Sequence, residues 1–154
     1  MKKRVGQHGG KPDEEHDKGR GEMFSGAIVR ARDVMRKEVG YIDGMATAKE
    51  AAAMMRAGKF SALIVKKRHS DDAWGIVVVQ DLVRGVIVPG RASHEVNVYE
   101  IMTKPVITVP ADMDIRYVAR LIFNSGIRRA PVEDKGELIG MIALSSLILE
   151  NDLF

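Results

Sequence analysis

The stretch Gly-Ile-Val-Val-Val-Gln-Asp at residues 75–81 decides how the rest of the chain is interpreted. Four consecutive β-branched residues, 76–79, indicate a short buried strand. Asp81, which precedes more apolar residues, is the expected first residue of a helix. A strand-to-helix corner presents backbone N–H groups, and here one carboxylate, to whatever lies beyond the strand end. Asp81 therefore caps the helix, holds a ligand, or does both.

The composition is that of one compact domain or two very small ones, since 45% of the 154 residues are hydrophobic and 29% are charged. The net charge of +3 is spread along the chain, without the long Lys/Arg run of a nucleic-acid-binding surface. The absence of cysteine excludes disulfides, thiolate catalysis and Cys-based zinc sites. No apolar run approaches the ~18 residues of a membrane span, and the N-terminal stretch lacks the apolar segment of a signal peptide. These features favour a cytoplasmic protein without a membrane partner.

Residues 1–22 predict a flexible tail, because they combine six basic and five acidic side chains with almost no aliphatic ones. Beyond Met23 the composition changes. Thr47 and Glu50 have the spacing of a capping box, and a helical apolar face follows as far as Gly58, which ends the helix. This face comprises Ala48, Ala51, Ala52 and Met55. The predicted strands of this region are residues 39–42, 60–65 and 74–79.

The same pattern recurs 67 residues later. The offset carries the helical face to Ile115, Val118, Ala119 and Ile122. Gly75 corresponds to Gly140 after a two-residue contraction, because residues 134–137 form a shorter hairpin turn. Each copy, with the order β-α-β-β-α, is too small to bury its sheet alone. We therefore expect an α/β (α+β) fold in which two copies pack by pseudo-twofold symmetry into one module. The expected parts are the tail (1–22), the first copy (28–88), a linker (89–97) and the second copy (98–150).

Several short motifs occur in a fixed order along the two copies. They are Asp33–Met35, Gly75–Asp81, Ile101–Pro110, Gly126–Val132 and Gly140–Ile142. In order, spacing and duplication they resemble a tandem pair of CBS (cystathionine β-synthase) domains, a Bateman module, over residues 28–150. The resemblance implies two clefts that bind adenosine derivatives such as AMP, ADP, ATP or S-adenosylmethionine. It also implies regulation of an unknown partner protein and a flat homodimer formed through the helices.

The ligand signature of that family is Gly, two hydrophobic residues, Ser or Thr, two further residues and Asp. The first copy keeps the glycine and Asp81, but Val78 stands at the hydroxyl position. The second copy keeps the glycine, but Ala143 replaces the hydroxyl residue and Ser146 replaces the acid. Neither copy is complete, and the loss is greater in the second.

The resemblance implies that Asp81 accepts hydrogen bonds from both ribose hydroxyls and that Arg128 and Arg129 of the other copy hold phosphate. The implied wall of this cleft comprises Val78, Lys104, Pro105, Val106, Ile107, Thr108 and Pro131. The opposite cleft offers Ser146 and the stretch 61–63, which has neither carboxylate nor arginine. We therefore predict one competent nucleotide cleft and one degenerate cleft.

Structural roles for the same residues stay open beside these ligand roles. Asp81 is a good helix cap, worth about 1 kcal/mol without any ligand, and one carboxylate can cap and bind at once. Arg128 and Arg129 alternate along a strand, so only one of them is expected to enter the cleft. Trp74, at a strand end, is expected to cover the edge of the core.

The chain shows no nucleophile elbow, phosphate-binding Walker loop, HExxH motif or calcium loop. Asp112 and Asp114 are interpreted as helix-start residues and not as a metal pair. We therefore expect no catalytic residues, no metal and no required cofactor. Three functions remain: a sensor of an adenosine-type ligand, a dimerising module without a ligand, and nucleic-acid binding. The last is weakest, because the chain without residues 1–22 is nearly balanced in charge.

Overall fold

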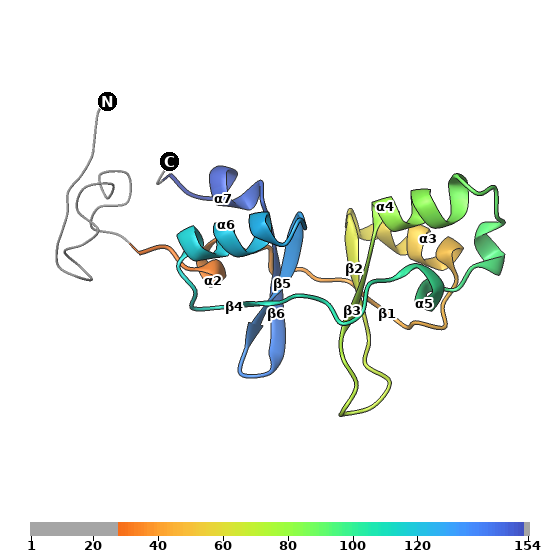
Figure 1. Cartoon of the computed structure of the whole chain (residues 1–154), viewed down its shortest axis with the longest axis horizontal. Coiled ribbons are helices and arrows are strands. Elements are labelled where there is room, and N and C mark those ends of the chain that lie inside the picture. The colour runs from red at the N-terminus through yellow and green to blue at the C-terminus, as the bar shows by residue number, and fades with distance from the viewer. Residues whose placement is uncertain (1–27, 153–154) are drawn as a thin grey trace.

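The computed structural model describes residues 28–152, which form two lobes side by side, each with one small sheet and covering helices (Figure 1). The first lobe contains β1 (Tyr41–Ile42), α3 (Ala48–Gly58), β2 (Ala62–Val65), β3 (Gly75–Val78), α4 (Val79–Leu82) and the π-helix η2 (Val83–Ile87). The second contains β4 (Val109–Pro110), α6 (Ile115–Asn124), β5 (Arg129–Asp134), β6 (Glu137–Ala143) and α7 (Ser146–Leu149). The predicted tail lies outside the described residues.

The two sheets have the same topology, which confirms the predicted duplication. In the first, β1 runs parallel to β2 and β2 runs antiparallel to β3. In the second, β4, β5 and β6 repeat this arrangement, with one irregularity after Val132. The hairpin at residues 134–137 turns through Lys135 and Gly136, which both have positive φ. None of the helices within residues 28–152 is long and apolar enough to cross a bilayer.

Helix α3 begins at the predicted capping box. The Thr47 hydroxyl accepts from the Glu50 amide at 3.1 Å, and the Glu50 carboxylate accepts from the Thr47 amide at 2.8 Å. The helix ends at Gly58, as predicted, and Lys59 after it takes the left-handed conformation, with φ 55°. Gly58 also leaves room for Phe60, since a Cβ at residue 58 would lie 2.2 Å from the Phe60 ring, which would have to shift.

The short first helix of each copy packs into the other copy's lobe. Helix α2 (Ala31–Val34) contributes to the core built on β4–β6 and α6. Helix α5 (Val98–Ile101), which follows the 3-10 helix η3 (Ser93–Glu95), contributes to the core built on β1–β3 and α3. Residues 35–39 and 102–106, which we call the crossing segments, connect each helix to its own copy. Each lobe therefore contains a helix from the other copy.

Each crossing segment pairs with the last strand of the opposite lobe. Arg36 and Met141 exchange two backbone hydrogen bonds of 2.8 and 2.9 Å, and Ile76 and Thr103 exchange two of 2.9 and 2.8 Å. Between the sheets lies a shared apolar cluster of Ala62, Ile64 and Ile76 with partly buried side chains from both lobes. Trp74 packs at this cluster with its ring 5.9 Å from that of Tyr41, as expected for a residue that covers the core edge.

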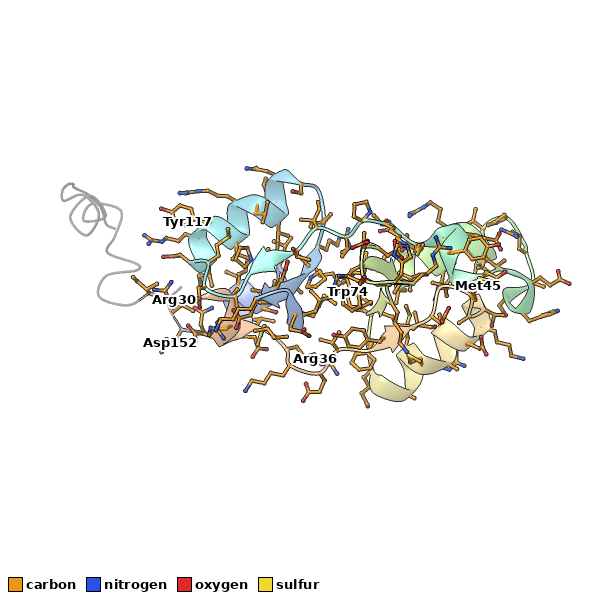
Figure 2. All side chains as sticks on the ribbon, turned by 90° about the horizontal axis from the view of Figure 1, so that it is seen from below. Arg30, Arg36, Met45, Trp74, Tyr117 and Asp152 are labelled. Carbon is orange, nitrogen blue, oxygen red and sulfur yellow. The ribbon has the colours of Figure 1, made fainter. Side chains whose placement is uncertain are left out.

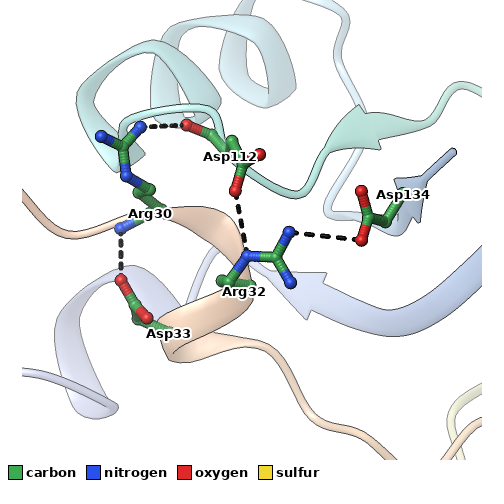
Figure 3. Close-up of polar contacts among 5 residues, drawn as sticks. All are labelled: Arg30, Arg32, Asp33, Asp112 and Asp134. Atoms are coloured by element: carbon green, nitrogen blue, oxygen red, sulfur yellow. Dashed lines mark hydrogen bonds and ion pairs between the residues drawn. The ribbon is translucent and has the colours of Figure 1, made fainter.

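Ion pairs fasten α2 to the second lobe (Figure 3). The Arg30 guanidinium donates to the backbone oxygen of Asp112 at 2.7 Å. Arg32 contacts the carboxylates of Asp112 and Asp134 at 3.0 and 3.3 Å. Asp112 therefore belongs to this clamp, whereas Asp114 is the predicted helix cap and accepts from the backbone amide two residues later at 2.9 Å.

Candidate functional site

The corner at Asp81 is a capped helix start. Helix α4 begins at Val79, two residues earlier than predicted, so Asp81 is its third residue. One carboxylate oxygen accepts from the Val78 amide at 2.9 Å, and the other accepts from the Arg84 guanidinium at 2.8 Å. The side chain is only 5% exposed. Both oxygens are thus engaged within the chain, and the ribose-binding role of Asp81 stays a prediction.

The equivalent corner of the second copy makes a similar hydrogen bond, although helix α7 begins at Ser146 itself. The Ser146 hydroxyl accepts from the Ala143 amide at 3.3 Å, as the Asp81 carboxylate accepts from the Val78 amide. The second copy therefore keeps the hydrogen bond to the strand-end amide with a neutral side chain and at a longer distance. The exchange of acid for serine removes charge from this corner without removing this hydrogen bond.

Two residues of the predicted cleft wall have partners of their own. The Lys104 ammonium donates at 2.7 Å to Asp72 in the β2–β3 loop, and this hydrogen bond holds the pKa of Asp72 far below its usual range. The Thr108 hydroxyl donates to Glu133 at 3.0 Å. Val106 packs between the sheets and Pro131 is fully buried. These four residues thus make packing or hydrogen-bond contacts within the protein itself.

The remaining predicted wall residues lie at the edges of the elements. Val78 is the last residue of β3 and is partly buried. Pro105 and Ile107 are exposed in the chain that leads from α5 to β4. Their ligand-binding roles stay predictions.

A cavity of about 330 Å³ lies between the first crossing segment and the corner of the second copy. It is on the Ser146 side, opposite the predicted competent cleft. Figure 2 shows Arg36, one of its lining residues, between the two lobes. The cavity is lined by Val34, Met35, Arg36, Glu38, Val39, Phe60, Ser61, Ala62, Arg129, Met141, Ala143, Ser145, Ser146 and Glu150. Of the residues predicted for the site, only Arg129 is among them.

The prediction that this cleft lacks both arginine and carboxylate is wrong. Arg36 and Arg129 line it together with Glu38 and Glu150. Arg129 enters from β5, which the sequence assigned to the Asp81 cleft. The repeat contains a sequence signal for Glu38. Residues 104–106 are predicted as cleft wall, and the offset of 67 residues maps them onto residues 37–39 of the first copy.

Arg36 is held at the end of helix α3. Its guanidinium donates to the backbone oxygens of Lys59 and Gly58 at 3.0 and 3.2 Å and lies 4.8 Å from the ring centre of Phe60. Glu38 is 3.6 Å from its Nε. A cation is favourable at this position, since the last carbonyls of a helix lack intrahelical partners and carry the negative end of its dipole.

The side chain of Arg129 has no hydrogen bond or ion pair with another residue of 28–152. Its side chain is partly buried; burial lowers the pKa of its guanidinium, and the neighbouring Arg128 lowers that pKa further. Arg128 is exposed, and of the two arginines only Arg129 lines the observed cavity, which is not the cleft for which the pair was predicted. An anion beside Arg129 would offset both unfavourable effects.

The rest of the cavity wall is suited to a partly apolar ligand with hydroxyl groups. Phe60, Met35 and Met141 supply apolar surface, and Ser61 and Ser145 supply hydroxyls. No group of three or more His, Asp or Glu side chains between residues 28 and 152 is placed to hold a metal ion. The arrangement can hold an organic anion with its charge at Arg129.

The family model described as CBS domain matches residues 31–87 and 98–150. The chain belongs to the CBS domain family. It carries two CBS domains, as the resemblance implied, and together they occupy most of its length.

Solved structures of other proteins share this fold. A hexameric CBS-CP12 protein from bloom-forming cyanobacteria has a TM-score of 0.78 and 38% identity, over 81% of this chain and 69% of that one. An uncharacterised conserved protein from Pyrococcus horikoshii has a TM-score of 0.70 and 25% identity, over 79% of this chain and 90% of that one.

Curated relatives include proteins of archaea and plants. The uncharacterised protein MK0525 of Methanopyrus kandleri is 37% identical over 122 residues, which are 78% of this chain and 61% of that protein. The mitochondrial CBS domain-containing protein CBSX3 of Arabidopsis thaliana is 33% identical over 66% of this chain and 51% of its own length. The match therefore spans about half to three fifths of these two relatives.

Proposed function

We propose that this tandem CBS pair is a regulatory module without catalytic activity that binds an adenosine-type anion in the cavity beside Arg129. The single observation that carries the proposal is an unpaired, partly desolvated guanidinium facing a cavity between two lobes. Because a buried charge without a counter-ion is unfavourable, an anionic ligand gains affinity there. Membership of the CBS family supports the adenosine class of ligand.

Different walls of the cavity are suited to different parts of an adenosine-type ligand. The cavity volume of about 330 Å³ falls near the lower end of small-molecule sites. Phe60 and the methionines would contact the base, and Arg129 would hold a phosphate or carboxylate through two parallel N–H groups. Glu150 lines the cavity four residues after Ser146 and supplies the carboxylate that this corner otherwise lacks.

Arg129→Met is expected to weaken AMP binding at least about tenfold, since hydrogen bonds to charged groups are worth about 1.5–3 kcal/mol. Isothermal titration of the full chain with AMP, ADP, ATP and S-adenosylmethionine measures the affinity. Arg128→Met is the matched control, because that side chain is adjacent but exposed, and we expect an affinity within about twofold of wild type.

The same titration separates the alternatives. Binding that survives Arg129→Met but is lost in Asp81→Ala would place the ligand in the first cleft, as the sequence predicted. A chain that binds none of the four compounds would contradict the sensor proposal and favour a dimerising module without a ligand. A ligand at 100 times its Kd should also raise the unfolding free energy by about 2.7 kcal/mol.

The helices present an apolar stripe that we propose is covered by a second copy of the chain. Val79, Val83 and Ile87 follow one another at four-residue intervals along α4 and η2, and all three are exposed. Ile148 and Leu149 are exposed on α7, which follows the equivalent corner of the second copy. The similar CBS-CP12 structure is hexameric, which supports self-association of this kind of module.

Val83→Glu is expected to reduce the sedimenting mass to that of one chain, because it places a charge in the middle of the stripe. Sedimentation velocity of the full chain at micromolar concentration measures the mass. Met45→Glu is the control, since Met45 is 68% exposed at the far end of the first lobe (Figure 2). A wild-type chain that sediments as a monomer would contradict self-association.

A further inference from the structure

Arg36 has two roles, one in the cavity wall and one at the end of helix α3. It lines the cavity, and its guanidinium also closes the C-terminal end of the 11-residue helix α3 through the carbonyls of Lys59 and Gly58. Its side chain is 47% exposed, so it is not locked in place by packing. The residue therefore connects the contents of the cavity with the stability of a helix end.

Glu38 lies 3.6 Å from the Nε of Arg36, and the two terminal nitrogens have two possible partners of different strength, the helix carbonyls and a bound anion. A guanidinium binds an anionic oxygen roughly twice as strongly as it binds a neutral carbonyl. An anion held by Arg129 would lie in the same cavity as Arg36. Transfer of the Arg36 donors from the helix carbonyls to the anion is therefore favourable, and it leaves the end of α3 without its cation.

We propose that Arg36 is a latch that holds the end of helix α3 in the free protein and moves to the ligand when the cavity is occupied. The inference rests on the proposed function, because it requires an anion in the cavity. The backbone amides of Lys59 and Phe60 both donate to Met55, and these bonds weaken when the latch leaves. Ligand binding then loosens one helix end while it orders the cavity.

The latch belongs to one cleft only. The offset of 67 residues places Thr103 at the position of Arg36 and Ile127 at the position of Phe60. The corresponding helix of the second lobe, α6, therefore has no guanidinium from a crossing segment at its end. Helix α3 packs against α4, which carries part of the exposed apolar stripe. A change at the end of α3 would therefore be transmitted to the surface proposed for the second copy. Ligand binding in the cavity would then alter the equilibrium between two states of that surface.

Hydrogen–deuterium exchange of the full chain tests the latch, with AMP as the probe. We expect peptides that cover residues 55–60 to exchange about threefold faster with AMP, while peptides that cover 141–150 exchange more slowly. In Arg36→Met, residues 55–60 should exchange fast with and without AMP. Arg56→Met is the matched control, because this arginine lies in the last turn of α3 but does not line the cavity, and it should respond to AMP as wild type does.

The outcomes distinguish failure of the latch from failure of the proposed binding site. Protection of 141–150 without faster exchange at 55–60 overturns the latch and leaves the proposed function standing. An AMP response at 55–60 that persists in Arg36→Met also overturns the latch. No protection at 141–150 overturns the binding site and the latch together.

Discussion

Gly140→Ala is expected to lower the unfolding free energy by about 2–3 kcal/mol, near the upper end of the usual cost of overpacking. A Cβ at this position would lie 2.8 Å from the backbone oxygen of Arg36 and 2.5 Å from the sulfur of Met35. The sulfur can move, but the oxygen is fixed, because it accepts from the Met141 amide at 2.9 Å. The first crossing segment would have to leave β6, and with it one wall of the cavity.

Urea denaturation of the purified chain measures this effect, and the expected loss corresponds to a decrease in Tm of roughly 5–10 °C. Gly75→Ala should cost less, since its added Cβ would be 3.1 Å from a flexible Met102 sulfur and 3.3 Å from the Thr103 oxygen. Gly44→Ala is the control, because it meets only ordinary contacts of 3.5 Å or more. Equal stability of the Gly140 and Gly44 variants would contradict the account of the crossing.

The two equivalent glycines illustrate which features of the fold can be predicted from the sequence. The repeat of Gly75 at Gly140, the capping box at Thr47 and the apolar face of α3 are sufficient to predict two copies with the element order β-α-β-β-α. These features are local or periodic, so each can be recognised in a single sequence. The exchange of α2 and α5 between the lobes is not local, because it depends on where residues 35–39 and 102–106 run after folding.

The site was harder to predict for the same reason. Arg129 was identified as an anion-binding candidate, but the sequence placed it opposite Asp81, whereas the structure places it in the cavity of the second copy. One strand near a pseudo-twofold axis can serve either cleft, and only the direction of the side chain decides. Arg36 was missed because its importance comes from the carbonyls of a helix end 22 residues later, which no motif records.

Asp81→Ala is expected to lower the unfolding free energy by about 2 kcal/mol, since it removes a helix cap and leaves the Val78 amide without a partner in a partly buried position. The ion pair with Arg84 adds little, because Arg84 is mostly exposed. Thermal and urea denaturation of the full chain measure the loss.

Asp81→Ser is the informative companion, because it gives the first copy the residue that the second copy already uses at the same corner. The Ser146 hydroxyl accepts from the amide three residues earlier, as Asp81 does, so Asp81→Ser should recover most of the stability that Asp81→Ala loses. It cannot recover a carboxylate that binds a ribose. If Asp81→Ser is stable and binds AMP with unchanged affinity, Asp81 is a cap and the ligand belongs to the cavity at Arg129. If it is stable but binds AMP more weakly, the carboxylate of the first cleft is part of the ligand site.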